Sequence, residues 1–510
     1  MNFERLAFSL GGRKEVARVD ASARTEVDGP SSRHQLGGPP APAESRPVSA
    51  RRSAEPEPRD WAFTWTLIFT AVLFLRPQDS FPVLEVLHLA ELSALAGLVS
   101  LVVGRLARRE PVTRMTPEFA GVIALGAVIL LTAPFSIWFG GAVSTFTDVY
   151  LKVILVYLLA VNVLNSPKRI ERLTWLLVLV LGFLAFRAVL DYVRGVNMIA
   201  RGTRVQGSVG GMMQNPNDLA LHMVVFIPLA LFMAMQPGRP IRRLIAAGAG
   251  FCMVGAVVAS GSRGGFLGLA LMLVVLGAFA ARQRPAAAFA GLLILICSLP
   301  LVPDQYWRRI ASITDESKDD YETTQARRQL FSEAYDAFLE NPLTGVGAGQ
   351  FKDYKPESRT EAWHETHNIW LQVASELGTA GLLVFTFLMA RAFGAVWQTR
   401  RLLARARAGA TGPRRAASPR RSPAAVSIPP DDAAMFDAHS AAMAASLAGF
   451  FVCAFFSSVA YNWTFYYLLV LAAAPRDILR AQIAWSARRA RVTAGTPARV
   501  SDLDVREAHA

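Results

Sequence analysis

Residues 173–193 read LTWLLVLVLGFLAFRAVLDYV, and this stretch decides the class of fold. It is long enough to cross the hydrocarbon of a bilayer as one helix, which takes about 20 predominantly apolar residues. Its two charged residues, Arg187 and Asp191, are four positions apart near one end, where they can pair with each other. We interpret the segment as a membrane-spanning helix, because only a helix satisfies its own backbone hydrogen bonds without water.

Eleven further apolar segments share this character, so the sequence predicts an all-α polytopic membrane protein with about 12 transmembrane helices. The composition agrees, because 18% of the residues are charged, against about 25% in a typical soluble protein, and the mean hydropathy is +0.32. The twelve predicted spans are about 61–75, 83–104, 116–138, 147–164, 173–193, 216–235, 244–259, 264–281, 285–302, 369–396, 437–457 and 459–475.

Polar segments rich in Arg, Ser and Pro surround and interrupt the predicted transmembrane domain, which covers 61–475. Residues 1–60 predict a disordered tail, because so few apolar side chains cannot offset the entropy of ordering the chain. Residues 398–436 predict a basic loop of low complexity, and 476–510 predict a second polar tail.

The loops predict the orientation of the helices. Basic residues concentrate in cytoplasmic loops of membrane proteins. With the N-terminus inside, five inner loops hold twenty basic residues and five short outer loops hold five. We therefore expect both termini in the cytoplasm. The five outer arginines are Arg76, Arg194, Arg201, Arg204 and Arg263.

Charge and cysteine content exclude several classes of protein. The net charge of +14 would suit a nucleic-acid-binding protein if the chain were soluble, but here the basic residues orient helices and contact anionic lipid headgroups. The three cysteines, Cys252, Cys297 and Cys453, all lie in apolar segments, so no disulfide framework or zinc spacing is present. We expect membrane lipids as partners, and neither nucleic acid nor a cofactor.

One predicted outer loop, residues 304–367, is large and not of low complexity. Apolar side chains recur at helical spacing and stop at Asn341-Pro342, and the glycine-rich stretch Gly345–Gly349 then predicts a tight turn. This pattern predicts a helical outer loop that folds as a small external subdomain.

Arginines in outer loops are candidates for binding an anion. Arg263 stands in the turn Ser260–Gly265, whose small residues let backbone N–H groups and the guanidinium approach one ligand together. Arg204 precedes the stretch Asn215–Asp218. A guanidinium forks onto phosphate and stays charged, so two or three such side chains would suit a diphosphate. The alternative for each is snorkelling or contact with lipid headgroups.

Two of the seven histidines, His364 and His367, stand where the large loop returns to the membrane. An imidazole with a near-neutral pKa can take a proton from a hydroxyl nucleophile. Together with Glu365 they could bind a metal ion, but no third histidine is nearby in the sequence, so we expect no metal.

These residues fall into motifs. His367-Asn368, nine residues, Gly378, two residues and Gly381 resemble the signature of the O-antigen ligase and O-antigen polymerase superfamily. The turn Ser260–Gly265 and the stretch 341–351 (NPLTGVGAGQF) are similar to companion motifs of that superfamily. The resemblance covers about 245–395, and the layout of spans is consistent with it elsewhere.

The resemblance implies an inverting, metal-independent glycosyltransferase of GT-C-like architecture. Its donor would be a glycan on undecaprenyl diphosphate, used at the periplasmic leaflet of the bacterial inner membrane, so the loop 304–367 would be a periplasmic loop. His367 resembles the essential histidine, Arg263 and Arg204 resemble the arginines that bind the diphosphate, and Arg76 is a weaker match. The remaining candidates for substrate binding are Arg201, His364 and Asn368.

Several functions stay open. The acceptor could be lipid A–core for a ligase, a growing glycan for a polymerase, or a serine or threonine for a protein O-oligosaccharyltransferase, because the acceptor site lies in variable loops. Polysaccharide-export proteins are further candidate partners. A transporter with twelve spans is the alternative from another class, although the sequence has no repeat symmetry about its middle.

Overall fold

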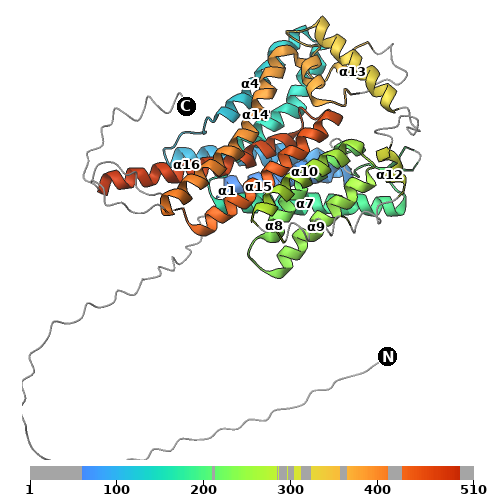
Figure 1. Cartoon of the computed structure of the whole chain (residues 1–510). Helices are drawn as coiled ribbons and strands as arrows, with labels where there is room; N and C mark the ends of the chain where they lie inside the picture. Colours follow the sequence, from blue (N-terminus) through green and yellow to red (C-terminus); the bar gives the residue numbers. More distant parts are fainter. Residues whose placement is uncertain are drawn as a thin grey trace, which may run out of the picture. The chain divides into compact units, whose positions relative to one another are not determined.

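The computed structural model describes residues 60–200, 202–208, 213–283, 285–286, 296, 304–311, 323–355, 365–411 and 428–493. The described residues form one compact helical unit (Figure 1). The predicted tail 1–60 lies outside the described residues except for Asp60, whose side chain caps the first helix by accepting a hydrogen bond from the backbone N–H of Phe63 at 3.3 Å.

The elements follow one another in this order. The first half contains α1 (Trp61–Leu75), α2 (Pro77–Ser80), η1 (Pro82–Leu87), α3 (Leu89–Ala107), α4 (Pro117–Thr132), η2 (Ala133–Phe135), α5 (Phe139–Ser144), the π-helical η3 (Thr145–Tyr150), α6 (Leu151–Val163), α7 (Pro167–Arg194), β1 (Met198–Ile199) and β2 (Arg204–Val205). The second half contains α8 (Pro216–Met235), α9 (Pro240–Ala259), α10 (Arg263–Gln283), α12 (Asp304–Ala311), α13 (Thr323–Glu340), η6 (Phe351–Asp353), α14 (Ile369–Thr411), α15 (Pro430–Cys453), η8 (Ala454–Phe456) and α16 (Trp463–Thr493).

The all-α, multi-span prediction is confirmed in its coarse form. Among the described residues, nine helices are long and apolar enough to cross a membrane, and α1 is a shorter apolar helix. The predicted spans 61–75 and 216–235 coincide with α1 and α8. The predicted span 285–302 lies outside the described residues apart from 285–286 and 296, so the number twelve stays a prediction.

Two predicted polar segments are more helical than expected. Helix α14 continues to Thr411, well into the predicted loop 398–436, and α15 begins within the same loop, at Pro430. Helix α16 likewise continues to Thr493, inside the predicted tail 476–510. The reason is composition, because Ala, Leu and Arg are strong helix formers, and α14 ends only before Gly412-Pro413.

Prolines mark where many helices begin. Helices α4, α7, α8, α9 and α15 all have Pro in their first turn. Proline fits there because its fixed φ is helical and the N–H that it lacks would have no partner inside the helix. Long apolar stretches bounded by such starts explain why local sequence predicted these helices well.

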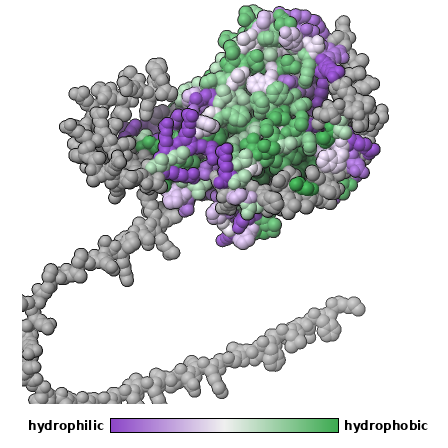
Figure 2. All heavy atoms as spheres, viewed as in Figure 1, coloured by the Kyte–Doolittle hydropathy of each residue, from purple (hydrophilic) through white to green (hydrophobic). Residues whose placement is uncertain are grey.

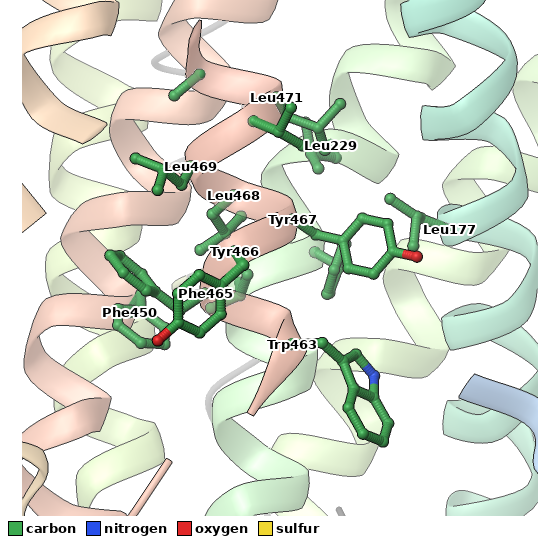
Figure 3. Packing of buried hydrophobic residues seen from close by; sticks show 14 of the residues in the cluster. Leu177, Leu229, Phe450, Trp463, Phe465, Tyr466, Tyr467, Leu468, Leu469 and Leu471 are labelled. Carbon is green, nitrogen blue, oxygen red and sulfur yellow. The ribbon is translucent and has the colours of Figure 1, made fainter. Parts of the chain in front are cut away.

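Helix α8 lies at the centre of the core, where it packs against α7, α9, α10 and α15. Aromatic and leucine side chains of α16 fill the space beside it (Figure 3). The hydroxyl groups of Tyr467 and Thr70 are 2.7 Å apart, which links α16 to α1. Small residues bring other helices close together, as where Gly268 of α10 faces Cys453 of α15.

The outer surface fits a membrane environment. Hydrophobic side chains cover much of the visible face of the helices, and hydrophilic ones gather towards its margins (Figure 2). On α3, one stripe at helical spacing stays exposed although it is apolar, which is expected of a face that contacts lipid. Its members are Leu92, Leu95, Val99, Val103 and Leu106.

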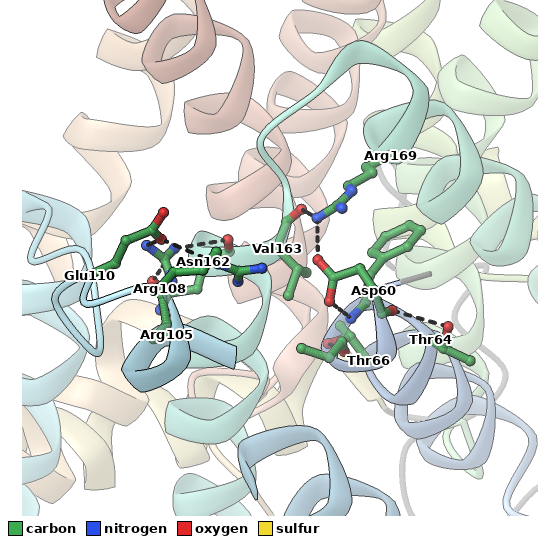
Figure 4. Close-up of polar contacts among 11 residues, drawn as sticks. Asp60, Thr64, Thr66, Arg105, Arg108, Glu110, Asn162, Val163 and Arg169 are labelled. Atoms are coloured by element: carbon green, nitrogen blue, oxygen red, sulfur yellow. Dashed lines mark hydrogen bonds and ion pairs between the residues drawn. The ribbon is translucent and has the colours of Figure 1, made fainter. Parts of the chain in front are cut away.

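Two of the predicted inner loops, between α3 and α4 and between α6 and α7, meet the start of α1 at one end of the helices, which we call the basic end (Figure 4). Arg105 at the end of α3 donates to the side chain of Asn162 at the end of α6, at 3.4 Å. Arg169 in α7 forms a 2.7 Å ion pair with Asp60 before α1. Arg476 of α16 forks onto Glu118 of α4 at 2.6 and 3.1 Å.

Gly378 interrupts α14 (Ile369–Thr411) in the N-terminal part of the helix. Its φ of 62° and ψ of −160° are non-helical, in a region that is essentially restricted to glycine. A Cβ atom there would lie 2.6 Å from the backbone of Leu343. The break lets the backbone after α13 dock onto α14, where Thr379 donates its N–H to the carbonyl of Pro342 at 2.8 Å.

We therefore expect Gly378→Ala to destabilise the protein by about 1–3 kcal/mol, from the backbone conformation alone, and by more where Leu343 cannot move. The measurement is the thermal unfolding midpoint of the purified protein in detergent. Gly394→Ala is the matched control in the same helix, because a Cβ at Gly394 meets nothing within 4 Å. An unchanged midpoint for Gly378→Ala would contradict this account.

Candidate functional site

The loops opposite the basic end carry most of the predicted site residues, and we call this end the site end. Strands β1 and β2 pair as a two-stranded antiparallel sheet, in which Arg204 lies opposite Ile199. Three further segments lie at the same end: the turn between α9 and α10, the start of α8 and the start of α14. Hydrogen bonds connect each of them to another segment of the site end.

Arg204 is buried, with 8% of its surface exposed, and it joins three segments. Its Nε donates to the backbone carbonyl of Ser260 at 2.9 Å, and an Nη atom donates to Oδ1 of Asn217 at 2.9 Å. Arg204 therefore fixes the β-hairpin against both the α9–α10 turn and the first turn of α8.

The α9–α10 turn holds Arg263 beside this arrangement. Ser262 donates its hydroxyl to the same Oδ1 atom of Asn217 at 2.9 Å, and accepts the backbone N–H of Gly265 at 3.1 Å. Ser262 thus acts as the cap of α10 and sets Arg263 at the first helical position, with its side chain half-buried. The neighbouring glycines are needed for packing, because a Cβ at Gly264 would lie 2.6 Å from Phe456 and one at Gly265 would lie 2.6 Å from Ala220.

His367 is held by residues 457–462, between η8 and α16, which we call the junction segment. The hydroxyl of Ser458 accepts the backbone N–H of His367 at 2.9 Å and is 2.9 Å from the hydroxyl of Thr366. His367 has a left-handed φ of 47°, which is uncommon outside glycine, and its imidazole is half-buried.

The junction segment also contacts α8, and this contact connects His367 to the arginines. The carboxylate of Asp218, beside Asn217, accepts a hydrogen bond from the hydroxyl of Ser457. One turn later, Nε2 of His222 is 3.4 Å from the side-chain amide of Asn462. Short bonded steps therefore lead from Arg204 through α8 and the junction segment to His367.

The external loop closes the other side of the junction segment. The carboxylate of Glu376 in α14 accepts the N–H of Gly349 at 2.9 Å and the hydroxyl of Tyr461 at 2.7 Å. The α13 helix and η6 pack together behind the loop through Leu330, Ala334, Ala337, Val346, Phe351 and Tyr354, against Leu371 of α14. The predicted helix before Asn341-Pro342 is confirmed, since α13 ends at Glu340.

An exposed cluster fastens η6 to the end of α13. Glu340 accepts hydrogen bonds from Lys355 at 2.6 Å and from the hydroxyl of Tyr354 at 2.7 Å. The hydrogen bond from Lys355, and then that from Tyr354, hold the pKa of the Glu340 carboxyl below its usual range. Glu365, two residues before His367, is exposed to solvent.

Residues 248–386 match the O-antigen ligase family. The match lies within the predicted range 245–395 and confirms the resemblance to the O-antigen ligase and polymerase superfamily. It covers Arg263, Glu376 and His367, whereas Arg204 and the junction segment lie outside it. A comparison with curated proteins gives no match to the chain. The family match supports a ligase- or polymerase-type glycosyltransferase with lipid-linked glycan and acceptor substrates.

The structure thus brings the segments of three predicted site residues to one end: Arg204, Arg263 and His367. Arg76 has a left-handed φ of 43° after α1, and its Nε forms a 2.8 Å ion pair with Asp79; no hydrogen bond from it to the other candidates is found among the described residues. Arg201 and His364 lie outside the described residues.

Asn368 has a local structural role. Its Oδ1 accepts the backbone N–H groups of Trp370 at 2.9 Å and Leu371 at 3.1 Å, so it caps α14. We expect Asn368→Ala to cost about 1 kcal/mol of stability through loss of this cap. Asn368→Ser, which can cap, should keep both the unfolding midpoint and the transfer activity near wild type. A large loss of activity in a stable Asn368→Ser protein would instead favour a role in substrate binding.

Sequence reasoning missed the residues that connect the site. Asn217, Ser458 and Glu376 have no distinctive motif of their own. Each joins segments that are distant in the chain, such as Glu376 with Tyr461, 85 residues later. A signal was present for Glu376, because a carboxylate within an apolar span is usually functional or paired.

The site end also favours negative charge through its helices. Four of the described helices that begin there are capped by side chains: Asn215 for α8, Ser262 for α10, Asn368 for α14 and Asn462 for α16. A helix N-terminus carries a partial positive charge of about half an elementary unit. Two guanidinium groups and these N-termini together suit an anionic ligand.

Proposed function

We propose that the protein is an inverting glycosyltransferase that moves a glycan from undecaprenyl diphosphate to an acceptor hydroxyl at the periplasmic face of the bacterial inner membrane. The observation that carries the proposal is Asn217, whose single Oδ1 atom binds both Arg204 and Ser262. Through it, the segments that carry the two arginines predicted to bind diphosphate are joined, and contacts of α8 with the junction segment lead on to His367.

The proposed reaction begins with the lipid diphosphate docked against Arg204 and Arg263. The acceptor oxygen attacks the anomeric carbon from the face opposite the phosphate, forming the new glycosidic bond as the old carbon–oxygen bond breaks. Negative charge grows on the leaving phosphate, and preformed guanidinium and helix N-terminal charges stabilise it. His367 takes the proton from the acceptor hydroxyl. The products are the glycosylated acceptor with inverted configuration and undecaprenyl diphosphate.

The diphosphate of the lipid donor is itself a good leaving group, so the proposal includes no nucleotide, metal or other cofactor. The proposed architecture is GT-C-like, with both termini in the cytoplasm and the basic end on that side. The positive-inside bias supports this orientation, and so does the meeting of two of the predicted inner loops with the start of α1 at one end of the helices.

The test uses the purified full chain in liposomes, with a synthetic polyprenyl-diphosphate glycan as donor and a soluble glycan as acceptor. We expect a glycosylated product whose new anomeric centre is inverted by NMR, and the same rate in the presence of EDTA. Retained configuration, or dependence on a divalent metal, would contradict the mechanism. Movement of intact donor across the bilayer without transfer would favour the transporter alternative.

Ligase and polymerase activities differ in what accumulates when the gene is deleted. Single repeat units attached to the acceptor lipid would indicate loss of a polymerase. Long chains left on the carrier lipid would indicate loss of a ligase, with lipid A–core as the acceptor. A gel of the surface polysaccharide separates these outcomes, and unglycosylated protein with normal polysaccharide would favour protein O-glycosylation.

A further inference from the structure

The Glu376 carboxylate binds two segments that are far apart in the sequence. One oxygen, Oε2, accepts both the N–H of Gly349 from the external loop and the hydroxyl of Tyr461 from the junction segment. The backbone of Phe351 adds a further hydrogen bond. Glu376 is 4% exposed, so these bonds are shielded from water and are costly to break.

The backbone around Glu376 reinforces the same contact. Val346 donates its N–H to the carbonyl of Ser375 at 2.8 Å, and Gly347 donates to the carbonyl of Glu376 at 3.0 Å. Gly345 can approach because it lacks a side chain, since a Cβ there would lie 2.3 Å from the backbone of Glu376. The glycine-rich motif is therefore shaped to dock on this point of α14.

The junction segment is hydrogen-bonded to two successive turns of α14. Near its own start it is also hydrogen-bonded to His367. One turn before Glu376, the side chain of Gln372 accepts the N–H of Ala460 at 3.1 Å. Two residues earlier in the junction segment, Ser458 accepts the N–H of His367. A shift of Tyr461 would therefore be passed to the residue that holds His367.

We propose that Glu376 is a positioning residue, which sets the place of His367 by fastening the junction segment and the external loop to α14. Glu376 does not touch the reacting atoms in this proposal. The inference rests on the proposed function for its catalytic consequence, but its structural part stands on the hydrogen bonds of Glu376, Gln372 and Ser458 alone. A misplacement of about 1 Å at a reacting group can cost about 100-fold in rate.

Three variants test the proposal by kinetics. Glu376→Ala should lower kcat by roughly 10- to 100-fold, while KM for the lipid donor changes much less, because the arginines remain. Tyr461→Phe keeps the ring that packs on Tyr150 and removes one bond, so we expect a smaller loss. Glu376→Gln keeps an oxygen that can accept both bonds now made to Oε2, so its kcat should lie between wild type and Glu376→Ala. Thr386→Ala on the same helix is the control, because among the described residues its hydroxyl bonds only to the carbonyl of Leu382.

Hydrogen exchange measured by mass spectrometry supplies a readout that needs no activity. Glu376→Ala should speed exchange in peptides covering 345–351 and 457–462, whereas peptides of α7 and α9 should keep wild-type rates. Unchanged exchange in 457–462 would overturn the positioning role, whether or not the protein transfers glycan. Equal loss of kcat in Glu376→Gln and Glu376→Ala would also overturn it, since the charge would then matter more than the acceptor geometry. Absence of transfer by the wild-type chain would refute the proposed function and leave the exchange result to stand.

Discussion

His367→Asn is expected to lower the rate of glycan transfer by about 100- to 10,000-fold, the range that a positioned acid–base group contributes. The variant removes the imidazole that is proposed to accept the acceptor proton. Asparagine is the right replacement because position 367 has a left-handed φ of 47°, which Asn tolerates better than Ala or most other residues. The backbone N–H that binds Ser458 is also retained.

The measurement is kcat for transfer in liposomes, together with binding of the lipid donor to the same preparation. Donor binding should change little, because the arginines are untouched. His88→Asn is a matched control, since His88 is exposed, has a similar φ of 42° and lies outside the proposed site. Wild-type kcat in a folded His367→Asn protein would exclude His367 as the base.

The helices could be predicted because their signals are local. Asp60 before α1 and Asn215-Pro216 at α8 mark starts that the apolar pattern then continues, and both predicted spans coincide with helices in the structure. The prediction of a loop after residue 397 was partly wrong, because α14 continues to Thr411. The composition of this stretch is that of a basic loop of low complexity, but its residues also have high helix propensity. Low complexity and helix formation are compatible when the repeated residues are Ala, Leu and Arg.

The candidate site could be predicted only as a set of separate loops. Residue types and spacing selected Arg204, Arg263 and His367, but their connection depends on pairings between distant segments. Asn217 binds Ser262, 45 residues later, and Ser458 binds His367, 91 residues earlier. Such pairings follow from how helices pack, which a hydrophobic pattern does not encode, so the role of Asn217 emerged only from the structure.

Asn368 illustrates how one residue can satisfy both a motif and a local rule. The motif groups it with His367 as a candidate for substrate binding, whereas its position before Ile369 is that of a helix cap. Asparagine is among the best residues at such a cap. The capping geometry accounts for Asn at this place in the motif without any contact with substrate.

Arg263→Lys is expected to lower kcat for transfer by about 100- to 1,000-fold, or about 2.7–4 kcal/mol, the cost typical of removing one preorganised donor from a site of developing charge. The positive charge is retained, so a smaller loss would be expected if charge alone mattered. An ammonium cannot fork onto two phosphate oxygens as a guanidinium does. The first position of α10, set by the Ser262 cap, should make this geometry hard to replace.

The matched control is Arg282→Lys, near the opposite end of the same helix, where the side chain is exposed. It makes the same chemical change on α10 and should leave kcat unchanged. Wild-type kinetics for Arg263→Lys would indicate that Arg263 contacts lipid headgroups, where an ammonium serves as well. If Arg263→Lys lowers kcat without changing donor affinity, while Arg204→Lys lowers both kcat and donor affinity, the two arginines have different roles. Arg204, bonded to Ser260 and Asn217, would then order the pocket for the diphosphate, and Arg263 would stabilise the charge that develops as the diphosphate leaves.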